Sequence, residues 1–195
     1  MLRRIWGAAL AAAMTLTLAA CDGGTPQFNN TDVTGAGYGK ALSLPDQDGK
    51  VRTLADFQGK VVAVFFGYTM CPDVCPTTLS MLSAVKKALG ADGDTLQVVF
   101  VSVDPERDQP EQMGRYVRAF DAANVALRGT PEQTAAVARE FNVFYQKNGS
   151  GPNYTMDHTA GIYVFDPQGR PRLFVRNGET PERLTHDIRL LLDGK

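Results

Sequence analysis

The chain has 195 residues, of which 44% are hydrophobic and 21% are charged, and its formal net charge is −1. This composition is typical of one globular domain with a hydrophobic core. The balanced charge and the lack of a long basic stretch exclude nucleic-acid binding along the phosphate backbone.

The first 20 residues have the pattern of a secretory signal peptide. Arg3 and Arg4 precede an apolar stretch over residues 5–20, which is shorter than the roughly 20 residues that span a bilayer. The stretch ends in "LAAC", which resembles a bacterial lipobox and predicts lipidation of Cys21 after removal of residues 1–20. Two other interpretations are an ordinary cleavage site followed by a chance cysteine and an uncleaved anchor helix.

Residues 21–39 are polar, glycine-rich and aperiodic, as expected for a flexible tether that begins at the lipidated Cys21. A cysteine with two or more acyl chains anchors a protein stably to a membrane. We therefore expect a lipoprotein of the bacterial cell envelope, with its folded domain, residues 40–195, in the periplasm, where disulfides can persist. The choice between inner and outer membrane stays open.

The first half of the predicted domain alternates strands and helices. We expect a hairpin, a buried strand, a helix, a second buried strand and a second helix over residues 40–54, 61–66, 76–89, 95–104 and 109–120. Pro76 fits the first turn of the first helix. Asp108 and Glu111 have the spacing of a capping box for the second helix.

The second half continues the alternation and ends in a hairpin and a helix. We expect a strand, a helix, a short strand, a loop, a hairpin and a last helix over residues 124–128, 130–141, 143–145, 146–157, 161–176 and 180–191. Thr130 and Gln133 have capping-box spacing, and residues 166–169 form the hairpin turn. This order predicts an α/β, thioredoxin-like fold, in which helices flank a central mixed sheet and an N-terminal β-hairpin extends it.

Two cysteines lie where a strand is predicted to meet a helix. Cys71 follows the strand and Cys75 opens the helix, at the sheet edge where ligand sites gather in α/β proteins. A helix N-terminus favours thiolate, so we expect a lowered pKa for Cys75. Three residues separate the pair, which on a helix places the Cβ atoms about 5–6 Å apart. A metal bridges that gap easily, whereas a disulfide needs about 3.8 Å and some rearrangement.

Three other roles compete with a metal site. A structural disulfide is disfavoured because so small a loop restrains little chain entropy. A thiol peroxidase is disfavoured because it requires a threonine three residues before the cysteine, where Tyr68 or Pro72 stands here. A thiol-disulfide oxidoreductase that acts on the cysteines of a cuproprotein partner stays the main alternative. Against it, the pair has one spacer residue more than thioredoxin, and His158 stands where thioredoxins carry a proline.

The chain has two histidines. His158 precedes the strand that should lie beside the cysteine-bearing strand, so it is the predicted third ligand. His186 lies opposite the apolar face of the last helix and is predicted to be a surface residue. Two thiolates and one imidazole form a soft donor set, which suits Cu(I) and can also hold Cu(II). Asp157 is either the partner that orients His158 or a turn residue.

Three segments in the same order, "FFGYTMCPDVCPTTL", "VSVDPERDQPE" and "YTMDHTAGIYVFDPQGR", resemble the Sco/SenC family of copper chaperones, over roughly residues 40–195. The resemblance implies a membrane-tethered, thioredoxin-like protein that is not an enzyme and binds copper through Cys71, Cys75 and His158. It also implies assembly of the dinuclear copper centre of cytochrome c oxidase subunit II. The chain departs from many members by carrying a lipobox where they have a transmembrane helix.

This interpretation implies further partners. A periplasmic copper donor must load the site. A thiol reductant is needed because Cys71 and Cys75 without copper can be oxidised to a disulfide, which must be reduced before it binds Cu(I). Two nearby features stay open. Met70 is either core filling or an auxiliary ligand, and residues 104–108 are either a turn with a helix cap, a docking surface or a carboxylate near the metal.

Overall fold

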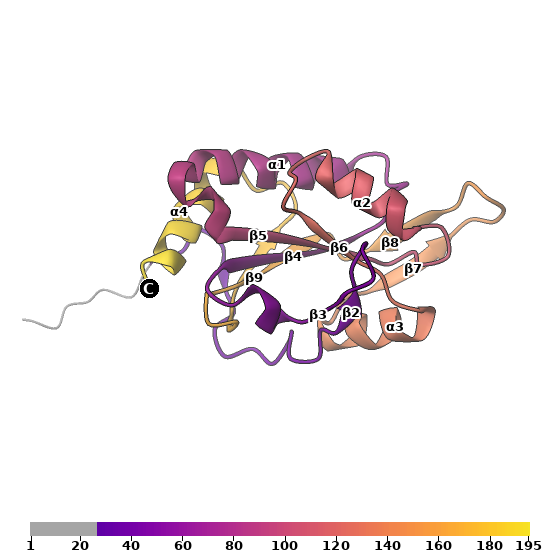
Figure 1. The fold of residues 1–195 in the computed structure, drawn as a ribbon, viewed down its shortest axis with the longest axis horizontal. Helices are drawn as coiled ribbons and strands as arrows, with labels where there is room; N and C mark the ends of the chain where they lie inside the picture. The colour runs from indigo at the N-terminus through magenta and orange to yellow at the C-terminus, as the bar shows by residue number, and fades with distance from the viewer. Residues whose placement is uncertain (1–26) are drawn as a thin grey trace, which may run out of the picture.

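The structure is a computed structural model that describes residues 27–195 (Figure 1). Its centre is a six-stranded sheet in the order β1-β10-β9-β4-β5-β6. The strands β4, β5 and β6 run parallel, and β9 is antiparallel to both β4 and β10. The bounds are Thr31–Asp32 for β1, Val61–Gly67 for β4, Leu96–Ser102 for β5, Val125–Leu127 for β6, Gly161–Phe165 for β9 and Pro171–Arg176 for β10.

Helices cover both faces of this sheet (Figure 1). One face carries α1, α2 and α4, and the other carries α3 and a short 3-10 helix, η1. Their bounds are Leu54–Phe57 for η1, Val74–Leu89 for α1, Pro110–Arg118 for α2, Pro131–Glu140 for α3 and Pro181–Leu192 for α4. None of the helices within residues 27–195 is long and apolar enough to cross a bilayer.

The apolar run of β4 explains why helices pack on both faces of the sheet. Successive side chains of a strand point to opposite faces, so Ala63 and Phe65 pack under α1 while Val64 and Phe66 pack against the α3 side. All seven residues of β4 are buried, as expected for a strand covered on both faces. The architecture confirms the predicted α/β, thioredoxin-like fold with a central mixed sheet.

Local signals in the sequence placed several elements correctly. The predicted N-terminal hairpin is present as β2 (Leu44–Pro45) and β3 (Val51–Arg52), which pair antiparallel. The capping box of α3 is also confirmed, since the Gln133 N–H donates to the Thr130 hydroxyl and the Gln133 side chain accepts from the Thr130 N–H. These features depend on residues a few positions apart, which a sequence displays directly.

Two local predictions are wrong. Asp108 does not cap α2, because Gln109 is the N-cap and the Asp108 carboxylate is bonded elsewhere. The predicted loop over 146–157 is largely a hairpin, with β7 (Tyr145–Asn148) paired to β8 (Thr155–His158). Its clustered glycine, asparagine and proline residues mark only the turn between these strands.

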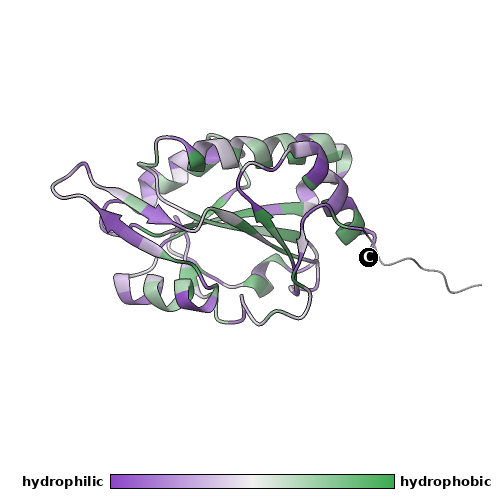
Figure 2. Cartoon of the chain, turned by 180° about the vertical axis from the view of Figure 1, so that it is seen from behind, coloured by the Kyte–Doolittle hydropathy of each residue, from purple (hydrophilic) through white to green (hydrophobic). Residues whose placement is uncertain are grey.

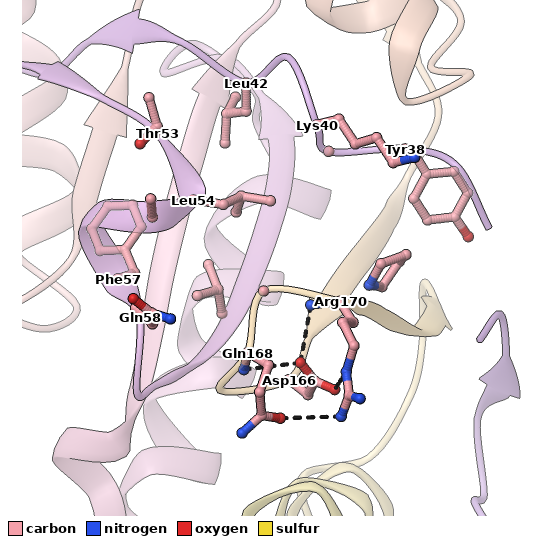
Figure 3. A pocket seen from close by; sticks show the side chains of 15 residues that line it. Tyr38, Lys40, Leu42, Thr53, Leu54, Phe57, Gln58, Asp166, Gln168 and Arg170 are labelled. Atoms are coloured by element: carbon pink, nitrogen blue, oxygen red, sulfur yellow. Dashed lines mark hydrogen bonds and ion pairs between the residues drawn. The ribbon is translucent and has the colours of Figure 1, made fainter. Parts of the chain in front are cut away.

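The β9–β10 hairpin turns at Asp166, as predicted (Figure 3). The Asp166 carboxylate accepts hydrogen bonds from the backbone N–H groups of Gln168 and Arg170, at 3.0 and 2.9 Å. Gly169 has φ +76°, a left-handed conformation that glycine adopts without strain. The turn borders a cavity of about 390 Å³. Among residues 27–195, no cysteine or histidine lines it, so this cavity is separate from the predicted metal site.

Part of the expected tether is folded against the domain. The Asp187 carboxylate, which is fully buried in α4, accepts hydrogen bonds from the backbone N–H groups of Asn29 and Asn30, both at 2.9 Å. Directly after Asn30, β1 pairs with β10. The packed part of the chain therefore includes residues before the expected boundary at 40. Residues 21–26 and the predicted signal peptide lie outside the described residues.

Replacement of Asp187 by Asn is expected to destabilise the domain by about 2 kcal/mol at pH 7, because buried N–H groups lose a charged acceptor. Burial alone would raise the pKa of Asp187, yet hydrogen bonds from Asn29, His186 and Asn30 hold it below its ordinary value. The stabilisation is therefore present above about pH 4 and is lost as the pH falls through the folded-state pKa. Urea unfolding of both proteins at pH 7 and pH 3 checks this, and an equal difference at both pH values would contradict it.

Candidate metal centre

The cysteines lie between the end of β4 and the start of α1. Cys71 lies in the connecting loop, where its N–H donates to the Tyr68 carbonyl at 3.2 Å, and Cys75 is in the first turn of α1. The strand ends at Gly67, where an added Cβ would lie 2.8 Å from the Cys75 sulfur. Glycine at this position therefore allows the buried sulfur to pack directly against the end of the strand.

A buried carboxylate holds the cysteine loop in place. Asp108 accepts hydrogen bonds from the Thr69 backbone N–H at 3.0 Å and from the Thr69 hydroxyl at 2.6 Å. Its other oxygen accepts from the Ser102 hydroxyl at 2.6 Å, so it ties the loop to the end of β5. Asp108 is therefore not the predicted helix cap but, of the alternatives for residues 104–108, the carboxylate near the predicted metal site. Its position at the carboxyl end of the neighbouring parallel strand was the one signal that pointed to this role.

The third predicted ligand comes from a distant segment. His158 is the last residue of β8, and its Nε2 lies 3.9 Å from the Cys75 sulfur, across a separation of 83 residues. The ligand atoms of Cys71, Cys75 and His158 all lie within 4.8 Å of one another. Metal–sulfur and metal–nitrogen bonds of about 2.3 and 2.0 Å fit ligand atoms at nearly this spacing. The structure thus brings together the three residues predicted from sequence.

Burial sets the protonation of these groups. Cys75 is fully buried, and this burial, more than any other factor, raises the pKa of its thiol, with the neighbouring Cys71 adding to the effect. The predicted lowering by the helix N-terminus is therefore wrong, because removal from water outweighs it. Burial lowers the pKa of His158 and favours its neutral form. The Nδ1 atom of His158 lies 3.2 Å from the Thr159 carbonyl, and donation there leaves Nε2 free to bind a metal.

Asp157 does not orient His158 through a hydrogen bond. In the described part of the chain, its carboxylate accepts from the Asn148 side chain at 3.3 Å. Neighbouring residues of a strand point to opposite faces, so the side chain of Asp157 in β8 points away from that of His158. Asp157 acts on His158 through charge alone, by opposing the lowering of its pKa. The interpretation of Asp157 as an orienting partner is therefore wrong for this structure.

The remaining candidates lie outside the group of three ligands. Met70 is 54% exposed and does not line the hollow beside the cysteines. Within residues 104–108, Asp104 is buried and accepts hydrogen bonds from Arg107 and Tyr154, whereas Glu106 is exposed, so a docking role of this segment stays a prediction. His186 is about half exposed and contacts Asp187, which agrees with its expected surface position.

The site opens to solvent on one side. A shallow hollow of about 410 Å³ is lined by residues of the cysteine loop and of β8, including Cys71 and His158. Cys75 is not part of this lining and lies beneath it. An incoming ligand can therefore reach a bound metal ion from the side of Cys71 and His158.

Fold and site together define a class of protein, namely thioredoxin-like domains with two cysteines at a strand–helix junction and a distant histidine. These three residues form a donor set that suits a soft metal ion. Comparison with known proteins then identifies the family. The model of the SCO1/SenC family matches residues 31–193. The chain belongs to the SCO1/SenC family, as its motifs predict.

Relatives in other organisms agree with this assignment. "Protein SCO2 homolog, mitochondrial" from Bos taurus is 35% identical over 191 residues, which cover 94% of this chain and 71% of that protein. The mouse counterpart is 37% identical over 155 residues, 76% of this chain and 60% of that protein. These mitochondrial proteins are thus longer than the matched region.

Solved structures share the fold. Bradyrhizobium japonicum ScoI, solved with copper bound, is 42% identical with a TM-score of 0.71, and the match covers 77% of this chain and 97% of that one. Apo Sco1 from Thermus thermophilus is 40% identical with a TM-score of 0.76, over 87% of this chain and all of that one.

Proposed function

We propose that this protein is a membrane-tethered copper chaperone that delivers copper to the dinuclear centre of cytochrome c oxidase subunit II. The observation that carries the proposal is the convergence of two cysteine sulfurs and a neutral imidazole within 4.8 Å. Family membership supports it, since members have been solved with copper bound. Copper is cargo in this role, so the protein is a binding protein and not an enzyme.

Delivery proceeds by exchange of ligands on the metal. The hollow exposes Cys71 and His158, whereas Cys75 lies behind them. A thiolate of the recipient can therefore bind copper from the open side while Cys75 still holds it. As copper leaves, the released Cys75 thiolate takes up a proton, which its buried setting favours because burial raises its pKa.

A transfer assay tests the proposal. The copper-loaded protein is mixed with the copper-free soluble domain of subunit II, in the presence of a chelator that captures free copper. We expect the spectrum of a dinuclear copper centre to form in the recipient. Copper that stays on this protein, or that reaches the recipient no better than from the chelator complex, would overturn the delivery role.

Copper affinity is expected to rise with pH between about 6.5 and 8.5. Burial raises the pKa of the Cys75 thiol, so a proton must leave as the metal binds, and each displaced proton changes affinity about tenfold per pH unit. The lowered pKa of His158 means that its imidazole is already neutral and adds little. Competition with a chromophoric Cu(I) chelator at several pH values measures the slope. An affinity that does not change with pH would contradict this protonation scheme.

The two cysteines support a second candidate function. Both are free, one partly exposed and one buried, and their sulfurs lie within 4.8 Å of each other. Reduction of a partner's disulfide would form a Cys71–Cys75 disulfide and transfer two electrons and two protons to the partner, after which a thiol reductant restores the pair. Turnover of copper-free protein on the oxidised subunit II domain, lost in Cys71→Ser, would establish this role.

The cellular location is also part of the proposal. We infer a lipid anchor at Cys21, with the domain in the periplasm of the bacterial envelope. Its support is the apolar segment ending in "LAAC". Metabolic labelling with a radioactive fatty acid should mark the wild-type protein and not Cys21→Ser. Equal labelling of both would remove the lipid anchor from the proposal.

A further inference from the structure

The hairpin that carries His158 is not part of the central sheet. β7 and β8 form a two-stranded sheet of their own, which projects from one end of the molecule (Figure 1). Figure 2 shows its strands as largely hydrophilic, in contrast to the hydrophobic central strands. At its base, the Thr159 N–H donates to the Phe144 carbonyl at 2.9 Å. The direction of the hairpin above this base therefore depends on contacts made by side chains.

Arg107 provides two hydrogen bonds and a ring contact to the segment that leads into β8. It lies in the loop after β5, and its Nη1 donates to the carbonyl oxygens of Tyr154 at 2.8 Å and Pro152 at 3.2 Å. Its guanidinium carbon lies 3.4 Å from the centre of the Tyr154 ring. The Nε atom pairs with Asp104, which also accepts from the Tyr154 hydroxyl at 2.6 Å. Arg107 and Asp104 thus hold the residues just before β8 through charge-assisted bonds.

A line of stacked side chains continues from Arg107 to the ligand. The guanidinium carbon lies 5.7 Å from the centre of the Tyr68 ring. The Tyr68 ring in turn meets the His158 ring edge to face, with centres 6.0 Å apart. Tyr68 is almost fully buried, so it cannot move without displacing one of its neighbours. The placement of the imidazole is therefore coupled to Arg107 both through β8 and through Tyr68.

We propose that Arg107 is a positioning residue for the copper site: it fixes the β7–β8 hairpin and the Tyr68 ring so that His158 faces the two cysteines. This inference rests on the copper site of the proposed function. Arginine suits the position because its planar fork reaches two carbonyl groups and stacks on a ring at the same time. Lysine offers a single point charge and cannot do both.

A double-mutant cycle tests this role by measuring Cu(I) affinity in the purified protein, with each variant checked for folding by circular dichroism. We expect Arg107→Leu to lower the affinity about tenfold, within the range for residues that orient a metal ligand. In the His158→Ala background the same substitution should change it less than twofold, because the ligand on which Arg107 acts is absent. Arg107→Lys should restore only part of the loss.

Arg128 offers a matched control. It donates from Nε and Nη2 to the Pro105 carbonyl of the same loop, at 3.2 and 2.7 Å. Within the described residues it makes no hydrogen bond to the β7–β8 hairpin, so Arg128→Leu should leave the affinity unchanged. If Arg107→Leu does not fold, Tyr154→Phe takes its place, because it removes only the hydrogen bond from the Tyr154 hydroxyl to Asp104. We expect a smaller loss of copper affinity, and this loss should disappear in the His158→Ala background. An unchanged affinity, or equal losses in both backgrounds, would overturn the positioning role. A wild-type protein that binds no copper would instead overturn the proposed function.

Discussion

Replacement of His158 by Ala is expected to lower Cu(I) affinity by more than about 100-fold, beyond the range for loss of a residue that merely orients a ligand. The imidazole is neutral and its Nε2 lies 3.9 Å from the Cys75 sulfur. Its removal leaves two sulfurs, one of them buried, and opens the third coordination position to solvent. Competition titrations with a chromophoric chelator measure the affinity, and absorption of the Cu(II)-loaded protein reports the change in the ligand set.

Two controls accompany this variant. His186→Ala removes the other histidine, which is exposed and contacts Asp187 rather than the cysteines, so the affinity should not change. Asp157→Asn removes the charge beside His158 and keeps the hydrogen bonds of the imidazole. It should change the copper affinity less than about threefold, because the effect of an exposed charge is weakened by solvent. An unaltered affinity in His158→Ala would exclude the three-ligand site.

Replacement of Gly67 by Ala is expected to impair both folding and copper binding. The added Cβ would lie 2.8 Å from the Cys75 sulfur and 2.8 Å from a carbon of the Phe100 ring. Both neighbours are fully buried, so the sulfur must shift or the strand must bend, and such overpacking costs about 1–3 kcal/mol. Because a ligand atom is displaced, the copper affinity should also fall about tenfold or more.

Gly37→Ala is the matched control for this substitution. Nothing lies within 4 Å of a Cβ at Gly37, so neither the unfolding free energy nor the copper affinity should decrease. Urea unfolding of the copper-free protein separates the effect on folding from the effect on the metal, and chelator competition measures the second. A Gly67→Ala protein with wild-type stability and affinity would show that the sulfur can move freely at this position.

Many of the correct predictions concern residues close together in the sequence, although the β7–β8 hairpin was missed. The hairpin at β2–β3, the capping box of α3 and the turn at Asp166 were all predicted correctly. Each depends on residues within a few positions of one another. Asp108 was misread because its spacing to Glu111 resembles a cap, while its true partners, Thr69 and Ser102, come from other segments.

At the candidate site, too, some predictions were correct and one was wrong. Its ligands were named from the cysteine spacing, from the place of His158 before a strand and from resemblance to a family that the comparisons confirm. The pKa of Cys75 was expected to be lowered by the helix N-terminus, yet it is raised. A helix terminus is visible in the sequence, but the burial that outweighs it results from the packing of Cys75 into the core between α1 and the sheet.

The sequence by itself therefore determined the order of the helices α1 to α4 and of the strands β4, β5, β6, β9 and β10. It also determined the junction that holds Cys71 and Cys75 and the soft donor set, because these follow from local periodicity and residue chemistry. Tertiary structure alone decided that Cys75 is buried, that Asp108 holds the cysteine loop, and that Arg107 holds the histidine-bearing hairpin. These features arise where segments distant in the chain pack together. The free energy of such packing cannot be read from the residue spacing within any one segment.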